Sequence, residues 1–257
     1  MEQALNHLSI GHGLPVVFQH GLTANIKQTE SLLAGLRNIR LLSIDCPGHG
    51  TSPLSDDYLV SFNRYADEVL RFIDRHQIEQ AVFGGISMGS GIAINIALRY
   101  PDRVKGLILV RPAWLDYKMP RNLQILLPAA QLMNQENGKR RFQELPEFKS
   151  IQRSSVAKSI LGVFAPEQQA ALSQVIERMV NDQPFSKMEE LKRISLPCLV
   201  LCNEDDPLHP IEMAEIIHQT IPGSVLRKVT SRYIDNDLHR TQVRNSIQEF
   251  IQKNNLT

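Results

Sequence analysis

The first 111 residues alternate short apolar runs with longer amphipathic segments, and this rhythm limits the folds open to the chain. Strands separated by helices build a parallel sheet with helices on its faces. The pattern returns near the C-terminus. The expected strands are 16–19, 41–44, 81–83, 106–110, 199–202 and 225–229, and the expected helices are 29–36, 65–76, 88–100, 211–220 and 241–252. The predicted fold class is therefore α/β, a mostly parallel central sheet flanked by helices.

Between residues 112 and 193 the strand-like runs disappear, and helix-length segments separated by prolines replace them. Proline cannot continue a helix, so it marks the ends of these segments. We predict an α/β core domain over 1–111 and 194–257, with a helical cap, or lid, inserted over 112–193. The first cap segment, 123–127, is apolar enough to roof a pocket, although a core helix would have the same composition.

Charge and composition argue against several classes of function. The 257 residues carry 28 Lys and Arg against 27 Asp and Glu, so overall charge favours neither nucleic acid nor an acidic membrane. No run of about 18 apolar residues occurs, and the N-terminus has no signal-like segment. We therefore expect a cytoplasmic protein that takes a small-molecule substrate and has no nucleic-acid or membrane partner. The sequence does not indicate an oligomeric state.

The cysteines Cys46, Cys198 and Cys202 form an odd and sparse set, which is typical of reduced thiols in a cytosolic protein. We expect them to be small buried hydrophobic residues. No Cys or His pair has the close spacing of structural zinc sites. We therefore expect neither a metal nor a cofactor.

The pentapeptide Gly85-Ile86-Ser87-Met88-Gly89 lies between a predicted strand and a predicted helix. A G-x-S-x-G sequence in that position indicates a nucleophile elbow, a strained turn that presents a serine hydroxyl above the end of a sheet. The two glycines would let neighbouring backbones pass without a Cβ clash. The competing interpretation is a glycine-rich loop that only joins the strand to the helix.

A serine hydroxyl needs a histidine to accept its proton and an acid to orient that histidine. Carboxylates follow the predicted strand 199–202, and His239 follows the last strand and a loop. The order Ser87, Asp206, His239 is the one expected of an elbow-bearing hydrolase. His239 has a second interpretation, a residue at a helix N-terminus. Of the other two histidines after this acid loop, His218 falls in a helix, and His209 is so close to Asp206 in sequence that it is a poor geometric choice.

Four segments of the chain resemble the α/β-hydrolase family, and the resemblance covers nearly the whole chain apart from the cap. They are the His-Gly segment 18–22, the D-x-P-G-H-G-x-S segment 45–52, the elbow 85–89 and the acid loop 205–210. In this family the aspartate immediately before the proline is usually catalytic, which favours Asp206 over Asp205. The resemblance gives segment 45–52 a mainly structural role.

The resemblance also implies a mechanism. Ser87 would attack a carbonyl carbon, His239 would take its proton, and Asp206 would hold the imidazole. The backbone N–H groups of Leu22 and Met88 would form the oxyanion hole. The proposed reaction is hydrolysis of a small carboxylic ester or related acyl substrate through an acyl-enzyme.

Two further residues are candidates for substrate contact. Arg111 follows the predicted strand 106–110 and is expected near the pocket mouth, either binding a substrate carboxylate or pairing with Asp116 or another acid. The single tryptophan, Trp114, either lines the junction with the cap or only packs there. His20 and His49 are expected to hydrogen-bond backbone groups in their turns.

Three alternatives to an esterase remain at this stage. The same fold supports hydrolysis of carbon–carbon bonds and, in its menaquinone-pathway branch, a lyase that uses the same triad as base. A third is a ligand-binding protein without catalysis. An aspartate nucleophile, as in the haloalkane dehalogenase and epoxide hydrolase branches, is disfavoured because Ser87 occupies that position.

Overall fold

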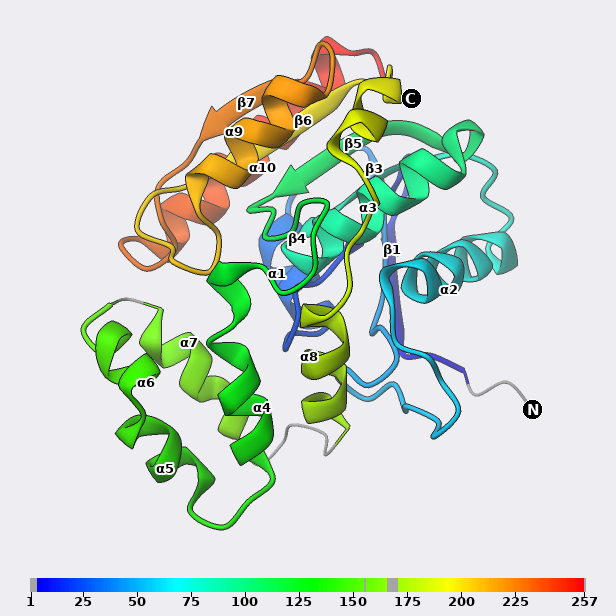
Figure 1. Cartoon of the computed structure of the whole chain (residues 1–257). Helices are drawn as coiled ribbons and strands as arrows, with labels where there is room; N and C mark the ends of the chain where they lie inside the picture. The colour runs from blue at the N-terminus through cyan, green and yellow to red at the C-terminus, as the bar shows by residue number, and fades with distance from the viewer. Residues whose placement is uncertain (1–3, 155, 166–170, 257) are drawn as a thin grey trace.

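A seven-stranded sheet forms the centre of the protein in the computed structural model, which describes residues 4–154, 156–165 and 171–256 (Figure 1). The spatial order is β1-β3-β2-β4-β5-β6-β7, and every neighbouring pair is parallel except β1 with β3. The strands are β1 (His7–Gly11), β2 (Leu14–Gln19), β3 (Ile39–Ile44), β4 (Ala81–Ile86), β5 (Val104–Val110), β6 (Cys198–Cys202) and β7 (Val225–Lys228). The predicted fold class, a mostly parallel sheet flanked by helices, is confirmed.

Helices cover both faces of the sheet, with α1 and α10 on one face and α2 and α3 on the other. The helices of the described residues are α1 (Ile26–Leu33), α2 (Phe62–Arg75), α3 (Met88–Arg99), α4 (Leu126–Met133), α5 (Gly138–Glu144), α6 (Pro146–Ile151), α7 (Ala157–Leu161), α8 (Leu172–Val180), α9 (Ile211–Thr220) and α10 (Asn236–Lys253). Four 3₁₀ turns accompany them: η1 (Pro101–Arg103), η2 (Arg121–Leu123), η3 (Gly162–Phe164) and η4 (Met188–Arg193). No helix among the described residues combines the length and apolarity that crossing a membrane would require.

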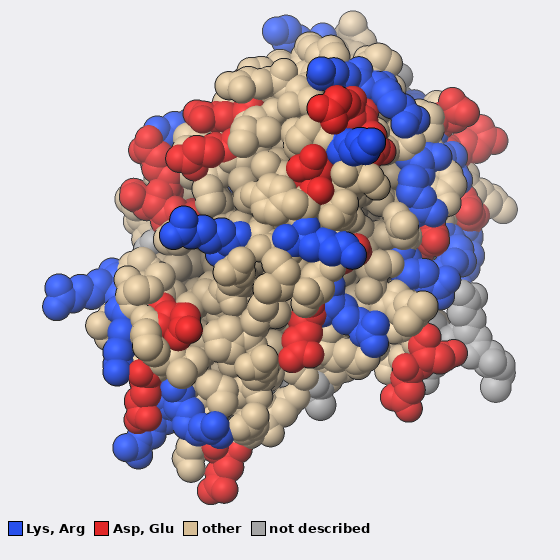
Figure 2. Space-filling view, viewed as in Figure 1, with Lys and Arg blue, Asp and Glu red and all other residues tan. Residues whose placement is uncertain are grey.

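Alternation along the strands divides the buried residues between two cores. Val16 and Phe18 of β2 pack with α1 and α10 on one face, whereas Val17 packs with α2 and α3 on the other. This is the period of two expected of a strand that is buried on both faces. Lys, Arg, Asp and Glu are interspersed on the molecular face in Figure 2, consistent with the near-zero net charge.

The stretch between β5 and β6 contains helices and turns, with no strand among its described residues. Helices α4 to α8 lie together at one end of the molecule, beyond the sheet (Figure 1). The segment 112–193 was predicted as a cap on this pattern, and its function as a lid stays a prediction. Its residues nevertheless reach the candidate site, as described below.

The structure departs most from the expected elements at its two ends, and the first helix also begins three residues earlier than expected, at Ile26. Strand β1 was not predicted, because four of its five residues are exposed at the edge of the sheet and give no apolar signal. The last helix begins at Asn236 rather than at 241. The side chain of Asp235 accepts hydrogen bonds from the N–H groups of Asp237 and Leu238, which caps the helix five residues earlier than expected. His239 therefore lies in the first turn of α10.

The free cysteines are all buried, as predicted. Cys198 and Cys202 occupy the two ends of β6, and Cys46 follows β3. Burial raises the pKa of the Cys198 thiol to about 12, so this thiol is protonated at neutral pH. These side chains fill the core as small hydrophobic groups.

Candidate active site

Ser87 lies in a strained turn between β4 and α3. Its φ of 57° and ψ of −110° are in a region that side-chain-bearing residues rarely adopt. A Cβ on Gly85 would collide with the backbone of Gly89, and a Cβ on Gly89 would collide with the carbonyl of Gln19. The two glycines therefore allow the chain to make this turn, as the sequence predicted.

The His-Gly segment lies directly beside the elbow. A Cβ placed on Gly21 would lie 3.6 Å from the Cβ of Ser87. The Gly21 N–H donates to Oε1 of Gln28 at 2.8 Å, which holds the loop in place. Within the described residues the Leu22 N–H has no hydrogen-bond acceptor, and Met88 is the first residue of α3, so its N–H has no acceptor in the helix. Met88 directly follows Ser87, and Leu22 lines the same cavity as Ser87, while their role as oxyanion-hole donors stays a prediction.

Segment 45–52 is held together by one carboxylate. Oδ1 of Asp45 accepts from the Ile26 N–H at 2.7 Å, and Oδ2 accepts from the Thr51 N–H at 3.1 Å. A Cβ on Gly50 would collide with the same carboxylate. The turn supports the loops at this edge of the sheet.

The expected hydrogen bonding to backbone groups is found for His20, which accepts the Cys46 N–H through Nε2 at 3.1 Å. The ring nitrogens of His49 are buried beside the backbone of Cys46 and Pro47, at a geometry looser than that of a hydrogen bond. The two rings pack with centroids 4.8 Å apart. Burial lowers the pKa of both imidazoles, and the turn therefore carries neutral rings.

Asp206 is the buried carboxylate of the acid loop, whereas Asp205 is exposed. Oδ2 of Asp206 lies 3.0 Å from Nη1 of Arg111 and 2.9 Å from Nδ1 of His209. Burial raises the pKa of this carboxyl group, but the adjacent His209 and Arg111 outweigh burial, so the net shift of the pKa is downward. The acid is therefore ionised at neutral pH.

His209 follows Asp206 by three residues, and a turn closed by the His209 N–H on the Asp206 carbonyl at 2.9 Å brings the side chains together. The ring meets the carboxylate at ion-pair distance but outside hydrogen-bond angles, and Nδ1 of His209 and Oδ1 of Asp206 are both buried without a hydrogen bond in the described part of the chain. Burial lowers the pKa of His209, Asp206 opposes this shift, and Arg111 and Arg232 add to it. The imidazole is therefore neutral at pH 7.

His239 has a different partner. Its Nδ1 hydrogen-bonds the carbonyl of Thr230 at 2.8 Å, and burial, followed by the charge of Arg111, lowers its pKa to about 4. Among the described residues, no hydrogen bond joins His239 to Asp206 or to Ser87. The structure thus brings Asp206 together with His209 and Arg111, and it does not join the three predicted triad residues through hydrogen bonds.

A cavity of about 270 Å³ lies above Ser87. Its walls come from the His-Gly loop, the elbow, the segment after β5, the helical insertion, the acid loop and the loop after β7. The lining residues are Gly21, Leu22, Thr23, Ala24, Gln28, Ile86, Ser87, Arg111, Trp114, Leu123, Leu126, Ser159, Ile160, Gly162, Val163, Leu208, His209, Arg232 and Tyr233. Leu123 and Leu126, from the segment expected to roof a pocket, do face this cavity.

Arg111 and Trp114 both line the cavity wall. Arg111 is 4% exposed and its guanidinium is paired with Asp206, an acid, as one of the two predicted roles of Arg111 required. The carboxylate of Asp116 instead accepts the Met188 N–H at 3.0 Å. Trp114 donates from its indole N–H to the carbonyl of Met179 in α8 at 3.2 Å. Its ring centroid also lies 5.4 Å from that of Phe62 in α2, so Trp114 joins the helical insertion to the core.

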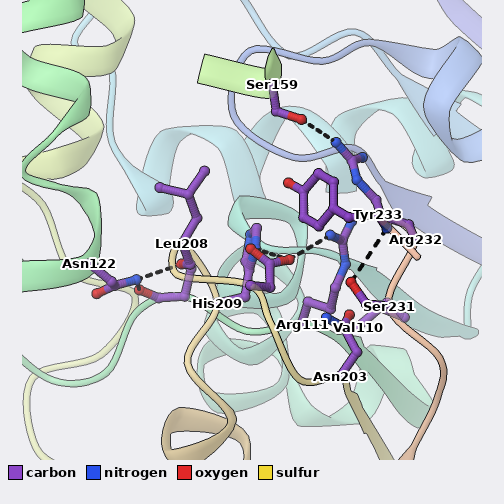
Figure 3. Close-up of polar contacts among 12 residues, drawn as sticks. Val110, Arg111, Asn122, Ser159, Asn203, Leu208, His209, Ser231, Arg232 and Tyr233 are labelled. Carbon is purple, nitrogen blue, oxygen red and sulfur yellow. Dashed lines mark hydrogen bonds and ion pairs between the residues drawn. The ribbon is translucent and has the colours of Figure 1, made fainter. Parts of the chain in front are cut away.

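Sequence reasoning set aside His209 and missed Arg232 and Tyr233. Figure 3 shows these residues around Arg111, with Arg232 extending to Ser159 of α7. The signal for His209 was its spacing of three from Asp206 inside a proline-containing turn, which is the spacing that closes a turn. Arg232 gives no such signal, because its position depends on how the loop after β7 meets the insertion.

Comparisons with known proteins agree with this architecture. Residues 15–233 match the alpha/beta hydrolase fold family, a match that ends before His239. The chain is 27% identical to Lipase 3 of Moraxella sp. (strain TA144) over 226 residues, covering 82% of this chain and 68% of that protein.

Solved structures also resemble nearly the whole chain, and two of them serve as examples. An esterase from Thermogutta terrifontis superposes with a TM-score of 0.77 at 23% identity, covering 98% of this chain and 94% of that one. A meta-cleavage product hydrolase from Pseudomonas fluorescens IP01 gives a TM-score of 0.71 at 20% identity, covering 96% and 94%. With its family match over most of its length, the chain belongs to the alpha/beta hydrolase fold family.

Proposed function

We propose that this protein is a serine hydrolase that cleaves small carboxylic esters or related acyl substrates through an acyl-enzyme on Ser87. The observation that carries the proposal is the strained backbone of Ser87 at the floor of a cavity that His209 also lines. Strain of this kind persists only where the surrounding structure enforces it, and it is concentrated at functional sites. A cavity of about 270 Å³ suits a small substrate.

The proposed first step is attack of the Ser87 hydroxyl oxygen on the substrate carbonyl carbon, with the hydroxyl proton passing to Nε2 of a histidine. The Leu22 and Met88 N–H groups stabilise the negative charge on the carbonyl oxygen, and Met88 adds the positive end of the α3 dipole. The protonated histidine then gives its proton to the leaving alkoxide. Water, deprotonated by the same histidine, releases the acid and restores the serine.

His209 is the base in this proposal, and His239 is the alternative predicted from the sequence. Support for His209 comes from its place on the cavity wall and from Asp206, 2.9 Å from its Nδ1, which leaves Nε2 for the serine proton. A neutral imidazole beside an ionised carboxylate is the resting state that a general base requires. His239 is bonded to Thr230 through Nδ1, the atom that a triad acid would hold.

The segment 112–193 has the role of a lid over Ser87 in this proposal. Its residues Leu123, Leu126 and Ile160 form an apolar wall of the cavity, which excludes water and strengthens the interactions of the oxyanion with its donors. Similarity to a lipase and an esterase supports ester hydrolysis. Similarity to a meta-cleavage product hydrolase makes cleavage of a carbon–carbon bond the second candidate, since the same residues would perform it.

The test combines labelling with turnover. Wild-type protein is treated with a fluorophosphonate probe, and the labelled peptide is identified by mass spectrometry. The same protein and Ser87→Ala are then assayed on p-nitrophenyl esters of increasing acyl length and on a meta-cleavage product. The proposal expects label on Ser87 and hydrolysis of short esters that Ser87→Ala lacks. Equal background rates for both proteins, with no label on Ser87, would contradict it. Cleavage of the meta-cleavage product alone would favour the second candidate.

A further inference from the structure

Arg232 gives the cavity a positive charge that the proposed chemistry does not use. It lies in the loop between β7 and α10, and its Nη2 donates to Oγ of Ser159 in α7 at 2.8 Å. Its guanidinium carbon lies 4.9 Å from the centroid of the Tyr233 ring (Figure 3). These two contacts hold the side chain of Arg232 on the wall of the cavity that Ser87 also lines.

The two arginines of the cavity differ in their counter-charges. Arg111 is paired with Asp206, so its charge is balanced. Arg232 forms no ion pair with any acid in the described part of the chain, and the cavity wall contains no Asp or Glu. Arg232 is half-buried, and its charge contributes to lowering the pKa of His209 and of His239. The cavity is therefore electropositive near Arg232.

A half-buried arginine without a counter-charge, held on the wall of a cavity, is a suitable partner for an anionic ligand. A guanidinium fits a carboxylate because its N–H groups match the two carboxylate oxygens. Ser159 occupies Nη2, and the described residues leave the other guanidinium nitrogens without hydrogen bonds. Apolar residues, among them Ile160 and Val163, form other parts of the wall and suit a short hydrocarbon chain.

From this arrangement we infer that the substrate carries a carboxylate, which Arg232 binds while Ser87 attacks an acyl group at the other end of a short chain. The substrate class is the half-ester of a dicarboxylic acid or a similar acyl compound with a free acid. This inference rests on the proposed function for the acyl group but not for the carboxylate. A purely structural Arg232, joining the insertion to the core through Ser159, would show no preference for charge.

The kinetic test uses two esters of similar shape that differ in charge. Methyl hydrogen glutarate carries a carboxylate where methyl 5-methylhexanoate has an isopropyl group. The ratio of their kcat/KM values is measured in a pH-stat for wild type, Arg232→Gln, Arg232→Lys, Ser159→Ala and the surface control Arg140→Gln, whose side chain is 82% exposed. We expect wild type and Arg140→Gln to favour the charged ester. The ratio of kcat/KM for the charged ester to that for the uncharged ester should fall about ten- to a hundredfold in Arg232→Gln. It should fall less in Arg232→Lys and in Ser159→Ala.

A binding test separates this inference from the proposed function. Glutarate is titrated into Ser87→Ala and into Ser87→Ala carrying Arg232→Gln by calorimetry. Binding that depends on Arg232, without turnover of either ester by the wild type, would support the carboxylate site and reject the hydrolase. Hydrolysis of both esters with the same ratio in every variant, together with no glutarate binding, would overturn the carboxylate site and keep the hydrolase. If Arg232→Gln does not fold, the wild-type ratio and Ser159→Ala decide the question.

Discussion

The two sides of the candidate site are built in different ways. Beside β2 and β4, backbone geometry determines the site, because the turn at Ser87 requires glycine at 85 and 89. Beside β6 and β7, side-chain partners determine it, and Asp206 has Arg111 and His209 within reach. A backbone constraint of this kind can be recognised in the sequence from its glycines. Which side chains will pair with one another cannot be recognised in the same way.

Replacing His209 and His239 in turn should have the largest effect. These two variants test the side of the site beside β6 and β7, where side-chain partners determine the geometry. We expect His209→Gln to lower kcat/KM for a short ester by about 10³-fold, since a positioned general base contributes roughly 10²- to 10⁴-fold. His239→Gln should stay within about tenfold of wild type, because its imidazole bonds Thr230. Steady-state kinetics with both variants, checked for folding by circular dichroism, measures the difference.

The reverse result would restore the predicted triad. If His239→Gln were inactive and His209→Gln active, His239 would be the base, as predicted from the sequence. Equal and small losses in both variants would remove histidine base catalysis from the mechanism and favour a binding protein.

The backbone constraint at the Ser87 turn can be tested by a glycine-to-alanine substitution, which adds one methyl group. Gly89→Ala places a Cβ against the carbonyl of Gln19, and we expect it to lower the free energy of unfolding by about 2 to 4 kcal/mol and to abolish fluorophosphonate labelling of Ser87. Gly162→Ala is the matched control, because a Cβ there meets no atom within 4 Å. Urea denaturation of the two variants gives the comparison. Similar stabilities would show that the turn tolerates a Cβ and that its strain is not enforced.

The same contrast explains how much of the fold the sequence revealed. Six strands of the sheet were predicted because buried strands are continuous apolar runs, and α9 was predicted with the bounds observed, 211–220. The exposed edge strand β1 lacks an apolar run and was missed. The start of α10 was missed because its N-cap, Asp235, precedes polar residues rather than an apolar pattern.

Within the site, local sequence pattern located the elbow and its glycines but not the partners of Asp206. The choice between His209 and His239 depends on where two loops end in space, and chain order alone leaves both possible. Arg232 was missed for a similar reason, since its hydrogen bond joins residues 73 positions apart in the chain. Such contacts are a property of packing rather than of local pattern.

The buried imidazole of His239 should make the free energy of unfolding depend on pH. The folded-state pKa of His239 is about 4, below its ordinary value near 6.5, so the neutral ring stabilises the fold fully above pH 6.5. This contribution is lost as pH falls from 6.5 toward 4, because the unfolded chain then binds a proton that the folded one does not. Between pH 7 and 5, His239→Gln should lose about 1 to 2 kcal/mol less stability than wild type in urea titrations. Parallel pH dependences would place the protonation effect on His20, His49 and His209 instead.

The smallest expected effect links Arg232 to the proposed base, His209. Burial, with a contribution from Arg232, lowers the pKa of His209, and catalysis requires its neutral form. The acid limb of kcat/KM for the uncharged ester should therefore have its midpoint below 6.5 in wild type. Replacing Arg232 by Gln removes a positive charge, which favours protonation of His209 and moves the midpoint upward, while Arg140→Gln leaves it in place. A midpoint that stays fixed or moves downward in Arg232→Gln would mean that the charge of Arg232 does not lower the pKa of the titrating base. The positive charge of the cavity would then have no effect on proton transfer from Ser87.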